Sequence, residues 1–261
     1  YVKVMMDNEI FDAENFRNEI IFKRTPGHHL ATGLDVMTDS ILFYIKSNNY
    51  VYNQQYQELT EKELDEKFPY IEKETGRRFT HQKLEQASNV YSKNEIRIIQ
   101  GKKIKTNLGW RWTQETIDER LSKNPYLIYW TKKGKPRYKT YADEYEGRKI
   151  GNLWDDITLI SSNSQEALGY ATQKPEDLIR RIILQSSDEG DIVADFFCGS
   201  GTTLAVAEKL GRRWIGCDLS KFGIQVTRKR LLDIRNSKDL LDEKGKRKYE
   251  NPARPFELRN I

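Results

Sequence analysis

The residues best suited to chemistry gather in one short segment. Residues 195–203 read DFFCGSGTT and follow an apolar run, and Asp218 lies 17 residues beyond Gly201. Glycine permits sharp turns and leaves room for a ligand at the N-terminus of a helix. A carboxylate at the end of the next strand can accept hydrogen bonds from both hydroxyls of a ribose. The segment therefore predicts a nucleotide-type site, and the absence of the third glycine of the dinucleotide fingerprint disfavours NAD.

A second candidate region is basic and aromatic. From residue 97 to residue 149 the chain has 14 Lys and Arg against 6 Asp and Glu, an excess of +8, whereas the whole chain carries +5. Eight Trp and Tyr side chains are interleaved with these charges. Cations suit phosphates and rings suit bases, so the region favours a nucleic-acid surface. A solvated basic face over an ordinary aromatic core is the alternative. The candidate contacts are Lys132, Lys133, Lys135, Arg137, Arg111 and Trp112.

Composition excludes several other classes of protein. No run approaches the roughly 18 apolar residues of a membrane span, so we expect no membrane partner. The first residues lack the apolar core and cleavage site of a signal peptide. Two cysteines, Cys198 and Cys217, cannot build a disulfide framework, which indicates a cytoplasmic protein. The three histidines show no metal-ligand spacing, so we expect no metal site.

The elements that must position these residues follow from periodicity and turn signals. Apolar residues at helical spacing predict helices at residues 1–11, 173–184 (with Pro175 in the first turn), 202–210 and 221–234. Short β-rich runs predict strands at residues 19–22, 40–45, 192–195 (a buried strand) and 214–217, and Pro26-Gly27 marks a turn. The order strand, glycine turn, helix, strand requires a parallel sheet, and the fold class is α/β.

The same pass predicts four parts of the chain. Residues 1–46 and 151–235 belong to one α/β domain, and residues 47–150 form an insert between them. The insert is polar and charged, and the capping box that begins at Thr60 opens a short helix within it. It has a small core of its own or leans on its neighbours. Residues 236–261 are predicted to be a loose charged tail.

A family resemblance adds to this description. Residues 195–203, followed by residues 211–220 (GRRWIGCDLS), resemble the cofactor motif and second strand of the DNA amino-methyltransferases, which modify adenine N6 or cytosine N4. Residues 172–176 (TQKPE) are similar to the motif that precedes the cofactor strand in the permuted β-class order of that family. Residues 1–11 and 16–24 resemble its middle, and residues 109–112 and 151–156 resemble its target-recognition region. The resemblance covers nearly the whole chain.

The resemblance implies a fold, a cofactor and a set of site residues. The fold would be the Rossmann-like methyltransferase sheet that binds S-adenosylmethionine, here incomplete, with residues 47–150 as the target-recognition insert. Asp195 would contact the methionine amino group and Asp218 the ribose. The other residues implied at the cofactor are Phe197, Gly199, Ser200, Gly201, Thr202, Thr172 and Lys174.

One motif that the resemblance implies is missing. In this family an Asp/Asn/Ser-Pro-Pro-aromatic motif accepts the hydrogens of the target amine and stacks on a flipped base. The chain has seven prolines and no Pro-Pro pair, and its nearest lookalike, Asn124-Pro125-Tyr126, is typical of a turn. In the permuted order the catalytic motif precedes everything seen here. We therefore expect a C-terminal portion that is inactive alone and has no catalytic residue.

The function that the resemblance implies is site-specific DNA methylation. The enzyme would transfer a methyl group from S-adenosylmethionine to N6 of adenine in duplex DNA, within a restriction-modification or phage system. Cytosine N4 as the target, or a non-catalytic DNA-binding module derived from such an enzyme, stays open. Partners beyond duplex DNA would be a second copy or a restriction subunit. A cytosine-5 enzyme is excluded because Cys198 follows Phe197, where such an enzyme needs a Pro-Cys nucleophile.

Overall fold

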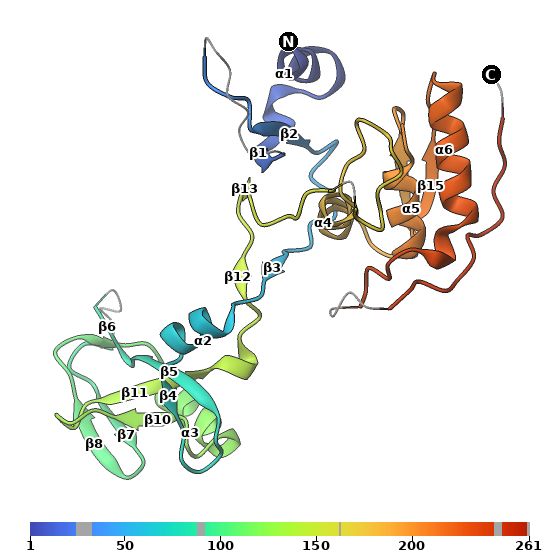
Figure 1. Cartoon of the computed structure of the whole chain (residues 1–261). Coiled ribbons are helices and arrows are strands. Elements are labelled where there is room, and N and C mark those ends of the chain that lie inside the picture. The colour runs from blue at the N-terminus through green and yellow to red at the C-terminus, as the bar shows by residue number, and fades with distance from the viewer. Residues whose placement is uncertain (25–32, 88–91, 162, 243–246, 260–261) are drawn as a thin grey trace. The chain divides into compact units, whose positions relative to one another are not determined.

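The computed structural model describes residues 1–24, 33–87, 92–161, 163–242 and 247–259 of the 261 residues. The chain divides into two compact units (Figure 1). The first unit comprises residues 1–55 and 149–261, and the second comprises residues 56–148. The predicted insert, residues 47–150, contains the whole second unit. The turn predicted at Pro26-Gly27 lies outside the described residues.

The front of the first unit is a small mixed sheet. A short helix, α1 (Val2–Met5), continues as a π-helix over Met6–Ile10, and a 3-10 turn over Ala13–Asn15 leads into the sheet. Strand β1 (Phe16–Lys23) pairs antiparallel with β2 (Thr38–Tyr44) and parallel with β13 (Leu153–Trp154). Buried Ile20, Phe22 and Trp154 pack on Leu178 of helix α4 (Glu176–Ser186). The strands predicted at 19–22 and 40–45 are confirmed.

The second half of this unit is the predicted β-α-β arrangement. Strand β14 (Ile192–Asp195), helix α5 (Thr202–Lys209), strand β15 (Arg213–Gly216) and helix α6 (Lys221–Leu232) follow in order, and a 3-10 turn covers Ile234–Asn236. The two strands are parallel, with Ile192 opposite Arg213 and Asp195 opposite Gly216. Helix α4 joins this half through Ile183, which packs with α5. The α/β class and the parallel unit are confirmed.

Two local predictions were wrong in detail. Helix α4 begins at Glu176 with Pro175 as its N-cap, not at Gln173. The residue before a proline avoids helical angles, and the Gln173 side chain instead bonds the backbone of Glu166 and Leu168. Strand β14 is also not buried on both faces. Val193 packs in the core, whereas Ile192 on the opposite face is 54% exposed.

The C-terminal segment is packed in its described residues, so the prediction of a loose tail was wrong there. Leu240 is buried, and Arg247 pairs with Asp239 at 2.6 Å. Farther on, the guanidinium of Arg254 pairs with the buried carboxylate of Glu208 on α5 at 2.8 Å. A charged segment can pack in this way because its cations pair with carboxylates, Asp239 within the segment and Glu208 on α5.

The second unit is built from antiparallel strands around its own core. Four strands lie in the order β10 (Ile128–Trp130), β11 (Pro136–Tyr141), β5 (Arg78–Lys83) and β4 (Tyr70–Ile71). Smaller sheets pair β7 (Ile96–Ile99) with β8 (Lys102–Lys105), β6 (Glu85–Gln86) with β9 (Gly109–Trp110), and β3 (Tyr56–Gln57) with β12 (Arg148–Lys149). The helical elements are α2 (Glu61–Lys67), α3 (Gln114–Lys123) and a 3-10 turn over Ala142–Glu144.

This unit has a hydrophobic core of its own, which is one of the two alternatives predicted for the insert. One buried cluster draws on strands β7, β9 and β10, helix α3 and the residue between β5 and β6: Ile99, Trp110, Ile128, Ile117 and Leu84. The predicted capping box is also confirmed, because the Thr60 side chain accepts a hydrogen bond from the Glu63 backbone N–H, and the Glu63 carboxylate accepts one from the Thr60 backbone N–H. The role of target recognition stays a prediction.

Candidate cofactor site and nucleic-acid surface

The glycine loop leaves β14 at Asp195 and enters α5 at Gly201. Gly199 and Gly201 have φ of +51° and +72°, angles that side chains rarely tolerate. A Cβ on Gly201 would lie 2.7 Å from the Thr227 side chain of α6. The Thr227 hydroxyl in turn donates to the carbonyl oxygen of Gly199 at 2.9 Å. Both glycines are therefore required for the turn, and Gly201 is also required for the close approach of α6.

Asp218, at the end of β15, holds the loop from the other side. Its Oδ2 accepts the backbone N–H of Gly199 at 2.7 Å, and its Oδ1 accepts that of Ser220 at 2.8 Å. A carboxylate has about four lone-pair positions, so each oxygen can accept one more hydrogen bond. Asp218 can therefore fix the loop and still accept hydroxyl groups from a ligand.

The acid and the rings at the start of the loop lie toward solvent. Asp195 is half-buried and accepts the backbone N–H of Phe197 at 3.0 Å. Phe197 is 88% exposed, and Phe196 and Leu219 are exposed as well. Apolar side chains at the ends of β14 and β15 thus flank two carboxylates, an arrangement that suits a ligand with a cationic group and a flat ring.

Ser200 and Thr202 occupy a different position from the other predicted cofactor residues. Both side chains are buried beneath the loop, where the Thr202 hydroxyl accepts from the Arg230 guanidinium at 2.9 Å. The same guanidinium donates to a Glu176 oxygen at 2.8 Å, and the Lys209 ammonium lies 2.7 Å from the other Glu176 oxygen. The side chains of Ser200 and Thr202 therefore support the loop from below.

The sequence analysis missed this buried charge network of Glu176, Lys209 and Arg230. Burial opposes ionisation of Glu176, but the two cations outweigh it and lower the pKa of the carboxyl. Burial also lowers the pKa of Lys209. The available signal was the charged pair Glu208-Lys209 at the end of the apolar run of α5, because charged residues are seldom buried without a partner.

The two residues expected to close the methionine end come from the segment before α4. Thr172 is exposed. The carbonyl oxygen of Lys174 accepts the Thr202 hydroxyl at 3.3 Å, which ties this segment to the loop. The Lys174 ammonium pairs with Asp39 of β2 at 3.1 Å. The structure therefore brings Lys174, the glycine loop and Asp218 together.

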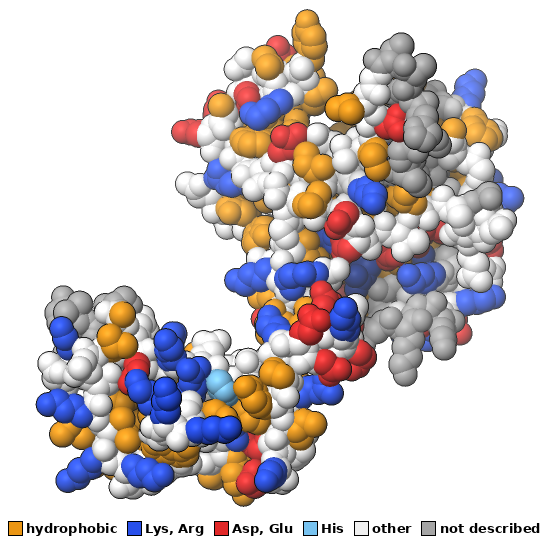
Figure 2. Space-filling view, turned by 60° about the vertical axis from the view of Figure 1, so that its left-hand side comes forward, with side chains coloured by type: hydrophobic (Ala, Val, Ile, Leu, Met, Phe, Trp, Pro, Cys, Tyr) orange, Lys and Arg blue, Asp and Glu red, His pale blue; other side chains and the backbone are white. Residues whose placement is uncertain are grey.

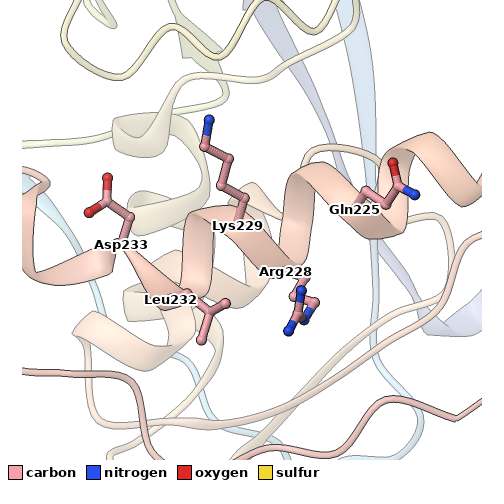
Figure 3. A pocket seen from close by; sticks show the side chains of 5 residues that line it. All are labelled: Gln225, Arg228, Lys229, Leu232 and Asp233. Carbon is pink, nitrogen blue, oxygen red and sulfur yellow. The ribbon is translucent and has the colours of Figure 1, made fainter.

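A hollow in the first unit lies elsewhere. It is lined along α6 by Gln225, Arg228, Lys229, Leu232 and Asp233 (Figure 3). The residues that face the glycine loop, Gly223 and Thr227, are not among them. We therefore locate the candidate cofactor site by the loop and Asp218 and not by this hollow.

The predicted nucleic-acid residues of the second unit separate into exposed and half-buried groups. Lys132, Lys133 and Lys135 are exposed in the turn between β10 and β11. Arg111 is exposed beside the Tyr138 ring. Arg137 is half-buried, with its guanidinium 3.4 Å from Nδ1 of His81.

Trp112, like Arg137, is half-buried. It packs against the buried core of the unit and against the Tyr138 ring, and the guanidinium of Arg120 lies 4.4 Å from the centre of its ring. Trp112 therefore acts mainly as part of the core. This agrees with the alternative prediction of an ordinary aromatic core beneath a basic face.

The Asn124-Pro125-Tyr126 lookalike is a turn, as predicted. Asn124 caps the end of α3, its Oδ1 accepts the backbone N–H of Tyr126 at 3.0 Å, and its Nδ2 donates to the Tyr141 hydroxyl at 3.0 Å. Both ends of the amide are occupied by the fold, so this segment does not resemble a site for a substrate amine.

Comparison with known families decides the class of the chain. The family model described as DNA methylase, which covers the N6 and N4 methyltransferases, matches residues 1–229. The chain belongs to this family. The match contains the glycine loop, Asp218, the segment before α4 and the entire second unit.

Curated relatives cover parts of the chain. The type II methyltransferase M2.DpnII of Streptococcus pneumoniae is 34% identical over 55% of this chain and 56% of its own length. M.EcaI of Enterobacter cloacae is 36% identical over 46% and 26%, and the DNA adenine methyltransferase YhdJ of Escherichia coli K12 is 39% identical over 47% and 42%. The matched part spans between about a quarter and just over half of these relatives. Among the helices that the structure describes, none is long and apolar enough to cross a membrane.

Proposed function

We propose that this chain supplies the cofactor-binding and DNA-binding parts of a DNA methyltransferase that uses S-adenosylmethionine and acts on N6 of adenine. The observation that carries the proposal is the glycine loop clamped by Asp218 in a chain that the DNA methylase family model matches over residues 1–229. The relative named as a DNA adenine methyltransferase favours adenine over cytosine N4 as the target.

The side chains around the loop fit the chemistry of this cofactor. Asp218 has lone pairs free for ribose hydroxyls, and Asp195 offers a carboxylate to an ammonium group. Exposed Phe197 and Leu219 provide apolar surface for a flat ring. Bound there, S-adenosylmethionine would supply an activated methyl group, and the residues of this chain would orient it.

Titration with S-adenosylhomocysteine, the demethylated product, tests the cofactor site. Wild-type chain should bind it, and Asp218→Ala should weaken binding by roughly 1–3 kcal/mol because ribose hydroxyls lose their acceptor. The variant also loses the clamp on Gly199, so its folding is checked first by circular dichroism. A folded Asp218→Ala chain that binds as tightly as wild type would refute the site.

The acceptor for the amine hydrogens is proposed to lie outside these 261 residues. They contain no Pro-Pro pair, and the only lookalike, at Asn124, is a turn. A radiolabelled methyl-transfer assay on mixed-sequence DNA should read background with this chain alone. Adding a segment that carries the family's Pro-Pro motif, fused or in trans, should restore labelling, and product analysis distinguishes N6-methyladenine from N4-methylcytosine. Turnover by the chain alone would contradict the proposal.

Duplex DNA is the proposed substrate, and a second copy or a restriction subunit is the further partner proposed. Charge supports the DNA assignment, because the second unit has 20 Lys and Arg against 15 Asp and Glu and so carries the whole net charge of +5. Affinity for duplex DNA should fall steeply with salt, as counterion release requires. Reversing the charges of Lys132, Lys133 and Lys135 to Glu should weaken binding to all sequences alike. Binding that does not depend on salt would count against this surface.

A further inference from the structure

The hairpin of β7 and β8 has two faces of opposite character. Its inner face carries buried Ile99 and half-buried Ile104, which pack into the core of the second unit. Its outer face carries Ile96 and Ile98, which are 55% and 49% exposed. The register places Lys105 opposite Ile96 and Lys103 opposite Ile98, so both lysines share the outer face. Only the inner face therefore packs into the core. The outer face presents apolar and cationic side chains to solvent.

Hydrogen bonds to the rest of the unit hold this hairpin at two places, the backbone of β7 and the tip. The Gln114 side chain of α3 makes two bonds to the backbone of Ile98, at 2.8 and 2.9 Å. At the tip, Gln100 and Gly101 have φ of +47° and +77°, the signs of a tight two-residue hairpin turn. The Gln100 side chain fixes that turn, because it donates to the carbonyl oxygen of Pro125 and accepts from the Trp130 indole.

The tip of the hairpin lies beside the turn proposed to contact phosphates. Trp130 ends β10 just before the turn that holds Lys132, Lys133 and Lys135, and it bonds Gln100 at 2.8 Å. The Lys102 ammonium lies 4.4 Å from the centre of the same indole ring. Figure 2 shows Lys and Arg side chains spread over the visible face of the second unit, with apolar side chains between them. The hairpin and the lysine turn therefore belong to one basic surface.

The electrostatics of the hairpin favour a polyanion as the occupant. Glu95, the carboxylate next to β7 in the chain, pairs with Arg97 at 2.6 Å. Within residues 92–105, all of which the structure describes, no carboxylate pairs with Lys103 or Lys105. The outer face therefore has a row of two apolar side chains on β7 beside a row of two lysines on β8, which matches base-pair edges beside one phosphate strand.

Dimensions favour the major groove. A two-stranded ribbon fits the major groove, which is about 12 Å wide, and the minor groove is only about half as wide. Alternate residues on a strand are about 6.7 Å apart, close to the length of two base-pair steps at about 3.4 Å each. Ile96 and Ile98 can therefore reach base pairs two steps apart. In the major groove an apolar side chain meets the methyl group of thymine.

We propose that the β7–β8 hairpin enters the major groove of the DNA substrate, with Ile96 and Ile98 against thymine methyl groups and Lys103 and Lys105 on the phosphates of the strand beside β8. This inference rests on the proposed DNA-binding function. It adds the element that touches base edges, whereas the lysine turn after β10 supplies charge alone.

Base substitution in the DNA tests the contact with thymine. The full chain is titrated with mixed-sequence 20-base-pair duplexes that contain either thymine or deoxyuridine, which lacks only the methyl group in the major groove. Wild type should bind the thymine duplexes about threefold more tightly. Ile96→Ser with Ile98→Ser should abolish that preference, and Ile71→Ser, which changes a 65% exposed isoleucine on β4, should keep it.

Salt dependence tests the lysines. Lys103→Gln with Lys105→Gln should reduce the slope of log affinity against log salt by about 1.8, which is roughly 0.9 for each lost phosphate contact. Lys62→Gln with Lys73→Gln removes the same charge from exposed sites of the same unit and should leave the slope nearly unchanged.

The outcomes separate this inference from the proposed function. If wild type binds DNA but does not distinguish thymine from deoxyuridine, or if the serine variant keeps the preference, the major-groove assignment is overturned and the proposed function stands. If wild type binds no duplex DNA even at low salt, the proposed function itself fails. Circular dichroism of each variant shows whether it is folded, which the solvent position of all four side chains leads us to expect.

Discussion

The two units of this chain use the same charged residues in opposite ways. The first unit has 24 Lys and Arg and 24 Asp and Glu, and several of them form buried pairs such as Lys209 with Glu176. The second unit has an excess of five cations, and many of its lysines point into solvent without a carboxylate. The first unit neutralises charge internally to fix the shape of a loop. The second leaves charge outside, where a polyanion can neutralise it.

This difference shows why net charge alone says little about either site. Buried ion pairs are costly to break because each partner has lost its water. Exposed cations contribute little to folding and act through the field they present to a charged partner. Mutations in the first unit should therefore be measured mainly as changes in stability, and mutations in the second mainly as changes in DNA affinity.

The sharpest test of the first unit is Glu176→Gln. The substitution removes the counter-charge of Lys209 and Arg230, both buried, and should lower the free energy of unfolding by about 3–5 kcal/mol. Chemical denaturation of the full chain measures this change. Asp177→Asn is the matched control, because the adjacent carboxylate is half exposed and pairs with Lys238 at 3.6 Å, and it should cost less than about 1 kcal/mol. If the two variants lowered the free energy of unfolding equally, the buried charge network would contribute no more to stability than the exposed Asp177–Lys238 pair.

The glycine loop provides the next largest effect. Gly201→Ala adds a Cβ at 2.7 Å from Thr227 in a left-handed backbone and should cost about 2–4 kcal/mol. Gly190→Ala has a similar φ of +89° but meets no atom within 4 Å, so it should cost only about 1–2 kcal/mol of backbone strain. The difference between the two unfolding curves isolates the close approach of α6. A Gly201→Ala chain no less stable than Gly190→Ala would refute that contact.

Most charges of the second unit are exposed, but the carboxylate of Glu72 is buried. Glu72 accepts hydrogen bonds from Lys139, Thr75 and Tyr141. Burial opposes its ionisation, but these donors outweigh burial and lower its pKa below the usual value of about 4.5. Its contribution to stability is therefore complete above about pH 4.5 and is lost as the pH falls through the lowered pKa.

Glu72→Gln checks this pH dependence. The variant should be less stable than wild type at pH 6 by about 1–3 kcal/mol, because Lys139 loses its charged partner. Between pH 5 and pH 3 its melting temperature should fall less than that of wild type, since the titrating group is gone. Parallel melting curves for the two proteins across this range would contradict the pKa assignment.

The smallest expected effect is on α6. Arg228→Ala with Lys229→Ala removes two exposed charges from the balanced first unit and should change DNA affinity less than twofold at 0.15 M salt, where the Debye length is about 8 Å. Lys132→Ala with Lys133→Ala removes the same charge from the second unit and should weaken binding about tenfold or more. Fluorescence anisotropy with one labelled duplex measures both. If the α6 variant loses as much affinity as the lysine-turn variant, the contrast between the two units is wrong.

Local order along the chain explains which parts of the site could be predicted. The glycine turn, α5, β15 and Asp218 lie within about 25 residues, and strand, turn and helix signals at that range come from neighbouring residues. The Glu176 network could not be predicted in the same way, because Lys209 and Arg230 are 33 and 54 residues away and their approach depends on how α4 packs.

The aromatic and basic residues of the second unit show a similar limit. Composition identified the region but not its faces, so Trp112 was placed on the surface although it packs on the core. Ile96, Ile98 and the lysines of β8 were not singled out, because their common face exists only once the two strands pair. Sequence spacing predicts which residues share a strand face, and pairing register decides what lies beside them.

The clamp of Arg254 on Glu208 has a consequence for how the protein is made. The two residues are 46 positions apart, and the guanidinium bonds both Glu208 oxygens and the carbonyl oxygen of Arg212. A ribosome that adds about 5–20 residues per second needs roughly 2–9 s to make that stretch. During that interval the nascent α5 has a carboxylate whose main counter-ion has not yet been synthesised. Helix α5, although encoded earlier, should therefore reach its final stability only after Arg254 has been synthesised.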